Sequence, residues 1–294
     1  LQTIKEGEGK SKYPMQLAQG STFNGFFNNY DGLASGLQPI GVKYDDASRK
    51  VVCTLEQDDI MDGLNWLHKW YQDGIINPDA NVVTDGGKGS IFGSAQGWPA
   101  AATTWAFNSG IEKYDLTQVF GPLYTTETIQ GSMNAISANS KYKTEALKVL
   151  QLMNTDSKFR DMCAYGTEGN YMEYAEDGTV QKLRDDWNWP SYTQGTFFIL
   201  STQADGDPDA WNQVKEQNES AVSSTCLGFA LDVTNIQNEI ANCNTVWDKY
   251  KNDLLTGASD PATAVPACIE ELKAAGLDTV IEEAQKQVDE FFAN

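Results

Sequence analysis

Apolar residues recur at helical spacing near the end of the chain. Between residues 236 and 254 they fall every three or four positions, at Ile236, Ile240, Cys243, Trp247, Tyr250 and Leu254. This spacing places apolar side chains on one face of a helix. A similar pattern, at Val280, Ala284, Val288 and Phe291, predicts a last helix with these side chains pointing inward. The C-terminal part of the chain, residues 231–294, is therefore expected to be a helical segment.

Start and stop signals divide this C-terminal segment into helices. Thr234-x-x-Gln237 and Thr279-x-x-Glu282 have the spacing of a capping box, in which two side chains satisfy free backbone N–H groups. Asp260-Pro261 places a capping carboxylate directly before a proline, which is favoured at the first helical position. Gly276 is typical of a helix end. Three helices are therefore predicted after residue 233.

Another amphipathic helix is predicted in the first third of the chain. From Asp58 to Tyr71 the apolar positions are Ile60, Leu64, Leu67 and Tyr71. Gly74 follows this stripe and is expected to have a positive φ as the residue that ends the helix. Trp66 and Trp70 lie beside the stripe and are predicted to belong to the core, whereas His68, one position off the stripe, is expected to be solvated.

Strand patterns alternate with helix patterns up to about residue 165. Residues 42–44 and 51–53 resemble a hairpin, and residues 119–123 and 132–137 are predicted strands. Helices are expected at residues 1–5, 143–154 and 157–164, and the aromatic-rich residues 166–212 are expected to be irregular. Strands alternating with helices and followed by a helical tail predict an α/β fold.

The charge balance excludes several kinds of partner. The chain has 21 Lys and Arg against 41 Asp and Glu, a formal net charge of −20. Such a surface repels phosphate groups and anionic lipids, so nucleic acid is not an expected partner. The five cysteines lack the spacing of a zinc site, and we expect most of them to be buried as small apolar residues.

The residues do not form a recognisable catalytic or metal-binding motif. The single histidine excludes a pair of histidine ligands, and the glycines of residues 86–90 lack the spacing of a phosphate-binding loop. We therefore predict no catalytic residue, no metal and no cofactor. The many carboxylates leave a glycosidase pair open, because the sequence does not give the distance between two carboxyl groups.

Two segments carry a resemblance to a known family. The helix at residues 58–72 runs through Gly74 into Asn77-Pro78-Asp79, and residues 98–107 read Trp-Pro-Ala-Ala-Ala-Thr-Thr-Trp-Ala-Phe. Together they resemble the extracellular solute-binding proteins of ABC importers, in particular the carbohydrate-binding group similar to maltose-binding protein. The C-terminal residues, with Gly228-Phe229-Ala230-Leu231-Asp232, look like those of Gram-positive lipoprotein members.

The resemblance implies a two-lobed, periplasmic-binding-protein-like fold with interdigitated lobes. Residues 1–130 would form an α/β ligand-binding lobe, residues 131–230 a crossover segment that contributes to the other lobe and the cleft, and residues 231–294 a helical segment packed on the lobes. The first lobe-forming segment of the family would be absent from this chain. The resemblance also implies a monomer outside the cell, anchored to the cytoplasmic membrane as a lipoprotein, with the transmembrane subunits of an ABC permease as its partners.

Aromatic side chains are the candidate ligand-binding residues. An aromatic ring covers the apolar face of a sugar, while amide and carboxylate groups bond its hydroxyl rim. Trp105-Ala-Phe107 resembles the Trp-Ala-Trp stacking element of the family, and Gln19 and Phe23 match a family loop that reaches the cleft. Packing into the core is the alternative for Trp105, and a bridge between lobes is the alternative for Trp187 and Trp189. The candidate set is Gln19, Phe23, Trp98, Trp105, Phe107, Trp187, Trp189, Tyr192 and Phe229.

The predicted function is the capture of a sugar or oligosaccharide and its delivery to a membrane permease. A carrier of peptides or of another polar solute is the first alternative, because one fold accepts many ligands. A carbohydrate-active enzyme and a surface adhesion module are alternatives of other classes. Turnover of a glycan would identify the enzyme, and binding without turnover would identify the carrier.

Overall fold

The computed structural model describes residues 1–8, 13–33, 39–85, 91–99, 101–102, 105–106, 112, 114–184, 186–204 and 206–293. Its chain divides into two compact units. Unit 1 consists of Leu1–Gln96, Leu123–Glu127 and Ser223–Asn294, and unit 2 consists of Gly97–Pro122 and Thr128–Val222. The chain therefore passes from one unit to the other four times.

These units differ from the three segments expected with boundaries at residues 130 and 230. Residues of the first hundred and the C-terminal helices form one unit because the helix at Asp58–Gln72 packs against two of those helices. Segments far apart in the sequence therefore share this core.

Unit 1 combines a small sheet with helices. It begins with α1 (Gln2–Glu8) and the 3-10 turn η1 (Gly25–Asn29). Strands β1 (Tyr30–Asp31), β2 (Ile40–Lys43) and β3 (Val52–Cys53) form an antiparallel sheet in the order β1-β2-β3, with Tyr30 opposite Lys43 and Ile40 opposite Cys53. A short 3-10 turn, η2 (Thr54–Glu56), leads into α2 (Asp58–Gln72). The expected hairpin is thereby confirmed.

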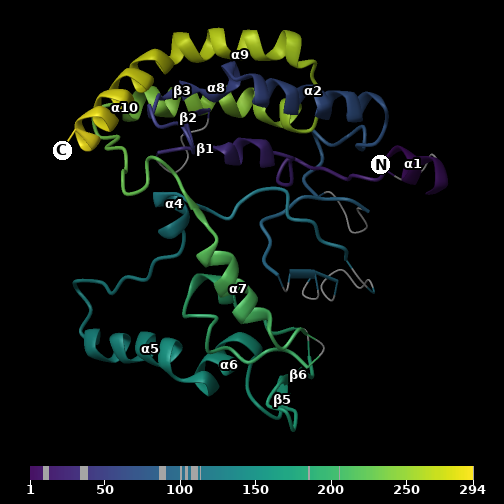
Figure 1. Ribbon diagram of the computed structural model, residues 1–294, viewed down its shortest axis with the longest axis vertical. Helices are drawn as coiled ribbons and strands as arrows, with labels where there is room; N and C mark the ends of the chain where they lie inside the picture. Colours follow the sequence, from purple (N-terminus) through teal and green to yellow (C-terminus); the bar gives the residue numbers. More distant parts are fainter. Residues whose placement is uncertain are drawn as a thin grey trace. The chain divides into compact units, whose positions relative to one another are not determined.

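Four helices of unit 1 pack together (Figure 1). They are α2 and the C-terminal helices α8 (Gln237–Leu255), α9 (Pro261–Ala275) and α10 (Leu277–Phe292). Within the stripe of α8, Cys243, Trp247 and Leu254 are buried, and so are Val280, Ala284 and Val288 of α10. The predicted helix faces are confirmed, except that Phe291 is half exposed near the end of α10.

The helix signals had mixed outcomes. Asp260 caps α9, with its Oδ1 accepting a hydrogen bond from the Ala262 N–H at 3.0 Å, and Gly74 and Gly276 have φ angles of 63° and 110°. Both predicted capping boxes are wrong. The Thr234 hydroxyl donates to Asp232 instead, at 2.6 Å, and α10 begins directly after Gly276, which leaves Thr279 inside the helix. The hydrogen-bonded turn at Asp232–Thr234 precedes α8, and the left-handed residue Gly276 precedes α10, so neither threonine caps a helix.

Unit 2 has a different composition of elements. Its longer helices in the described part of the chain are α5 (Lys143–Thr155), α6 (Ser157–Tyr165) and α7 (Ala210–Glu219), with a 3-10 turn η3 (Ser191–Thr193). Strands β5 (Met172–Tyr174) and β6 (Val180–Lys182) form an antiparallel hairpin. Helices α5 and α6 confirm the sequence prediction, whereas the hairpin lies in residues 166–212, which were expected to be irregular, and α7 begins at the end of that region.

The two strands predicted before α5 are largely wrong. Only β4 (Leu123–Tyr124) forms in the first region, followed by the short α4 (Thr126–Ile129), and residues 132–137 form no strand. Strand β4 pairs with β7 (Val222–Ser223), where the Val222 and Ser224 N–H groups donate to the Pro122 and Tyr124 carbonyls. A strand needs a partner, and the described part of the chain offers none to residues 132–137.

The two units also differ in their cores. Unit 1 contains an extended buried cluster, which includes four of the cysteines: Cys53, Cys226, Cys243 and Cys268. The buried apolar cluster in the described part of unit 2 consists of Tyr165, Met172, Val180 and Leu200. Among the described residues, no helix is both long and apolar enough to cross a membrane.

Candidate functional site

Trp98 and Trp105 lie together in unit 2. Both rings are half-buried, and their centroids are 5.9 Å apart with the planes at 78°, an edge-to-face arrangement. The Trp105 ring also lies close to Gly97, where an added Cβ would be 3.3 Å from it. Phe107 lies outside the described residues. The partly exposed tryptophan pair is available for stacking on a ligand.

A second aromatic group of unit 2 lies in residues 186–192. The Trp187 indole N–H donates to the Cys163 carbonyl at 3.0 Å, and its ring lies 5.2 Å from that of Tyr171. Trp189 is half-buried, and its indole N–H has no hydrogen-bond partner among the described residues. Tyr192 is 74% exposed. Trp187 is thus held in place by its indole N–H, the unpaired indole N–H of Trp189 is buried, and Tyr192 is exposed to solvent.

A buried arginine holds the backbone of residues 191–196 by hydrogen bonds. Arg160 of α6 is fully buried and donates from Nε to the Thr196 carbonyl and from Nη2 to the Ser191 carbonyl, each at 2.9 Å. Its guanidinium lies 5.3 Å from the centre of the Phe197 ring. Burial lowers the pKa of Arg160 from its ordinary value, because a low-dielectric interior disfavours charge. The main-chain carbonyls stabilise this cation and hold the loop on α6.

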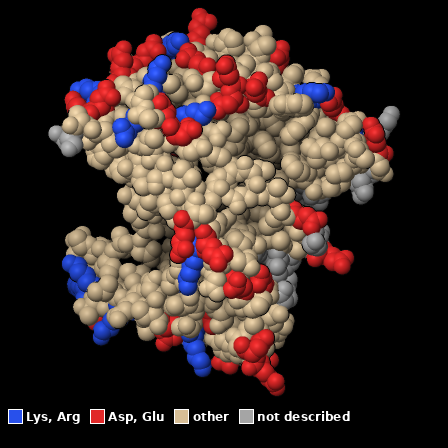
Figure 2. All heavy atoms as spheres, in the orientation of Figure 1, with Lys and Arg blue, Asp and Glu red and all other residues tan. Residues whose placement is uncertain are grey.

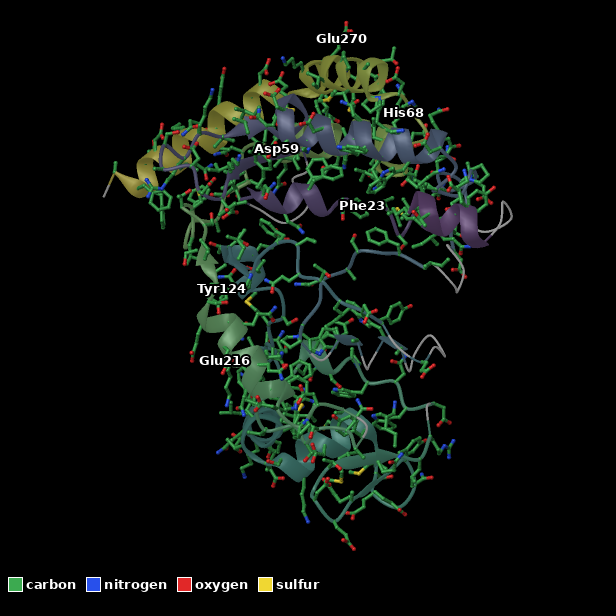
Figure 3. All side chains as sticks on the ribbon, turned by 45° about the vertical axis from the view of Figure 1, so that its right-hand side comes forward. Phe23, Asp59, His68, Tyr124, Glu216 and Glu270 are labelled. Carbon is green, nitrogen blue, oxygen red and sulfur yellow. The ribbon has the colours of Figure 1, made fainter. Side chains whose placement is uncertain are left out.

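Gln19 and Phe23 lie in unit 1. Gln19 is exposed and donates from Nε2 to the Asn81 carbonyl at 3.0 Å. Phe23 (Figure 3) is half-buried, its N–H donates to the Leu255 carbonyl at 3.1 Å, and its ring lies edge-on to Trp70 at 6.3 Å. Phe23 therefore presents part of its ring to solvent from an anchored backbone.

Phe229 has a different environment from the other candidates. Its side chain is 4% exposed and belongs to the buried cluster of unit 1, with its ring 5.6 Å from that of Phe291. A ring packed in the core has no free face for a ligand. We therefore leave Phe229 out of the binding site proposed below.

The sequence analysis missed an exposed aromatic side chain. Trp66, expected in the core, is 56% exposed. It lines an apolar hollow of about 290 Å³, here named the Trp66 hollow, whose wall consists of Phe23, Phe26, Gly63, Trp66, Leu67 and Trp70. The position of Trp66, two residues after Leu64 of the buried stripe, could have indicated exposure, because residues two apart do not share a helix face.

His68 and the charged side chains contribute no evident catalytic arrangement. His68 is half-buried rather than fully solvated as expected, because its Nδ1 lies 2.8 Å from the Gly257 carbonyl. Acidic and basic side chains are interspersed with uncharged surface on the face shown in Figure 2. The described residues contain no group of three or more His, Cys, Asp and Glu side chains placed to hold a metal ion.

The fold is similar to that of a known class of protein. The resemblance to the extracellular solute-binding proteins of ABC importers is confirmed, and the chain has a two-lobed solute-binding-protein fold in part. Residues 225–293 match the family model of a domain of unknown function, DUF3502.

Among individual proteins, the chain is similar to a carbohydrate ABC transporter substrate-binding protein of Streptococcus pneumoniae. The two are 26% identical over 279 residues, which cover 91% of this chain and 57% of the relative. The chain thus spans little more than half the length of this curated relative.

Crystal structures of the N-glycan transport solute binding protein NgtS from the same organism are similar as well. NgtS in complex with Man1GlcNAc has a TM-score of 0.82 at 24% identity, over 99% of this chain and 67% of that chain. NgtS in complex with Man5GlcNAc has a TM-score of 0.77 at 25% identity, over 99% of this chain and 66% of that chain.

Proposed function

We propose that this chain is part of the solute-binding component of an ABC importer that captures an oligosaccharide and does not cleave it. One observation carries the proposal: 99% of the chain superposes on a solute-binding protein in complex with the glycan Man5GlcNAc, at 25% identity. An N-glycan-derived oligosaccharide is therefore the substrate class that we propose.

The aromatic side chains supply a physical reason for this ligand. Half-exposed rings at Phe23, Trp98, Trp105, Trp187 and Trp189 and the exposed ring of Tyr192 can cover the apolar faces of sugar residues. Gln19, which is exposed, can bond a hydroxyl group with the acceptor oxygen of its side-chain amide. These are the residues that we assign to binding, with Phe107 added by its resemblance to the stacking element of the family.

The remaining parts of the proposal rest on the resemblance to the solute-binding proteins of ABC importers. The protein acts as a monomer outside the cell, anchored as a lipoprotein, and delivers its ligand to the transmembrane subunits of an ABC permease. The formal charge of −20 is compatible with this role, because it disfavours adhesion to anionic lipids and leaves a neutral ligand unaffected.

A thermal-shift and calorimetry screen tests the proposal. The panel contains Man1GlcNAc, Man5GlcNAc, other neutral sugars, and peptides. A ligand at 100-fold over its Kd stabilises the protein by about 2.7 kcal/mol, so a sugar that binds raises the unfolding midpoint measurably. Chromatography of the recovered glycan is expected to show no cleavage. Peptide hits without sugar hits, or shortened glycan products, would contradict the proposal.

A further inference from the structure

Residues 187–197 of unit 2, here named the aromatic loop, are anchored at both ends. The loop contains three of the side chains assigned to ligand binding: Trp187, Trp189 and Tyr192. At its start, the Trp187 indole N–H donates to the Cys163 carbonyl of α6 at 3.0 Å. Near its end, the Thr196 N–H donates to Oδ1 of Asn154 in α5, also at 3.0 Å. The backbone between these two points is therefore tied to neighbouring helices.

Arg160 holds the same loop from the protein interior. Its Nε and Nη2 donate to the Thr196 and Ser191 carbonyls, each at 2.9 Å. Gly195 allows this close approach: its φ is 73°, and a Cβ added there would lie 3.0 Å from Nε of the arginine. One guanidinium thus fixes the distance between the two backbone positions that flank Tyr192.

The burial of Arg160 costs stability. The side chain is fully buried, and its third nitrogen, Nη1, has no hydrogen-bond partner among the described residues. A buried cation loses its hydration, and an unpaired buried donor adds to this cost. Its two acceptors are neutral main-chain carbonyls rather than a carboxylate. Because apolar side chains often replace buried charges without loss of stability, the gain from Arg160 lies in the backbone that it holds.

The aromatic loop presents a ring to solvent from this fixed backbone. Tyr192 lies in η3 and is 74% exposed, so its own burial does not hold it in place. The Phe197 ring, at the end of the loop, lies 5.3 Å from the Arg160 guanidinium and is stacked on Trp211 of α7 at 5.0 Å. A loop that is ordered before the ligand arrives binds more tightly, because less conformational entropy is lost on binding.

We propose that Arg160 is a positioning residue for ligand binding. Through the main chain of residues 191–196, it keeps Trp189 and Tyr192 in the arrangement that stacks on an oligosaccharide. The inference rests on the function proposed above, because it requires that the protein binds a glycan. Arg160 is fully buried and acts through the loop rather than by touching the ligand. Its loss therefore lowers the affinity while the fold persists.

Calorimetric titration with Man5GlcNAc, combined with hydrogen–deuterium exchange, tests this role. Arg160→Met removes the donors and keeps a long apolar side chain. It is expected to weaken binding by about fivefold or more, as for the added cost of ordering one or two side chains. The amides of residues 191–196 are expected to exchange about tenfold faster in this variant. Arg160→Lys keeps the charge but not the planar fork, and an intermediate affinity is expected.

Two further variants serve as control and as second test. Tyr165→Phe removes another hydrogen bond from α6 to a main-chain carbonyl, that of Ser201 at 2.8 Å, which lies outside the aromatic loop. It is expected to leave the Kd unchanged. Asn154→Ala removes the acceptor of the Thr196 N–H. Asn154 is exposed, so this variant folds, and a weakening of about twofold is expected.

The possible outcomes separate the positioning role from the function on which it rests. Glycan binding by native protein with an unchanged Kd in Arg160→Met would overturn the role of Arg160 and leave the proposed function standing. If Arg160→Met does not fold, an unchanged Kd in Asn154→Ala would do the same. Equal weakening in Tyr165→Phe would show a general loss of stability and overturn positioning as well. Failure of native protein to bind any glycan would overturn both proposals.

Discussion

At the scale of single residues, a substitution of Trp105 distinguishes a ring that stacks on a ligand from a ring that packs in the core. Its ring is half-buried and contacts Trp98 edge-on. Trp105→Ala is expected to weaken sugar binding by about 1 kcal/mol or more, while the unfolding free energy falls by less than the 3–5 kcal/mol typical of a core tryptophan. Affinity and urea midpoint are measured on the same variant. A large loss of midpoint with unchanged affinity would remove Trp105 from the site and leave Trp187 and Trp189 as the stacking candidates.

The cysteines differ in accessibility, which a thiol titration can detect. All five are free, and Cys163 alone is half-buried while the others are buried. Burial raises the pKa of Cys53 and Cys226 to about 11 and that of Cys268 to about 12, which keeps these thiols protonated and unreactive at neutral pH.

We therefore expect one thiol per chain to react with a disulfide reagent in native protein, and five after unfolding. Burial also raises the pKa of Cys163, so its reaction is slow at neutral pH and accelerates as the pH rises toward that pKa. Cys163→Ser should abolish the native reaction. A native reaction that persists in this variant would show that another cysteine becomes exposed.

At the scale of elements, two predicted helix starts form a matched pair. Asp260 caps α9 through its carboxylate, whereas Thr279, predicted to cap α10, lies within that helix. Asp260→Ala is expected to cost about 1 kcal/mol of unfolding free energy, because the Ala262 N–H loses its side-chain acceptor. Thr279→Ala should have almost no effect or stabilise slightly, since alanine favours helix. Urea unfolding of both variants checks this, and equal losses would contradict the assignment of the cap.

The turn after α8 depends on a glycine for two reasons. Gly257 has a φ of 79°, and a Cβ there would overlap the Leu67 carbonyl oxygen of α2. Gly228, in the same unit, has a φ of 94° but no atom within 4 Å of the added Cβ. Both substitutions to alanine incur backbone strain of about 1–2 kcal/mol.

Gly257→Ala is expected to cost clearly more than Gly228→Ala, about 3 kcal/mol or more in total, because α2 and the turn must also move apart. The difference between the two losses of unfolding free energy measures the cost of the steric overlap between the new Cβ at position 257 and α2. A difference near zero would mean that the turn relaxes without disturbing α2.

At the scale of the whole molecule, the two units should differ in local stability. The stripe of α8 lies in the extensive core of unit 1, whereas residues 132–137 of unit 2 form no strand and are largely exposed. Amides without stable hydrogen bonds exchange rapidly with solvent. We expect residues 132–137 to exchange about a hundredfold faster, or more, than residues 243–254 in a hydrogen–deuterium exchange measurement. Strong protection of residues 132–137 would show that they are paired.

Local signals in the sequence predicted a large part of the elements. The stripes of α2 and α8, the cap at Asp260 and the positive φ at Gly74 all depend on residues within a few positions of one another. The predicted strand at residues 132–137 is wrong because a strand depends on pairing with a neighbour that local sequence does not specify. The candidate site followed from the resemblance of Trp105-Ala-Phe107 and of the Gln19–Phe23 loop, since no single residue type identifies a sugar site.

The sequence by itself determined most of the helices, the net negative charge and the resemblance to solute-binding proteins, because periodicity, charge and family-like segments are properties of the linear order of residues. Only the tertiary structure decided which aromatics are free. Phe229 is buried and Trp66 exposed, although both are large apolar residues, because their burial depends on which distant segments pack over them. Tertiary packing also decided that the first hundred residues and the C-terminal helices form one unit. Their hydrophobic contacts join surfaces that lie far apart along the chain.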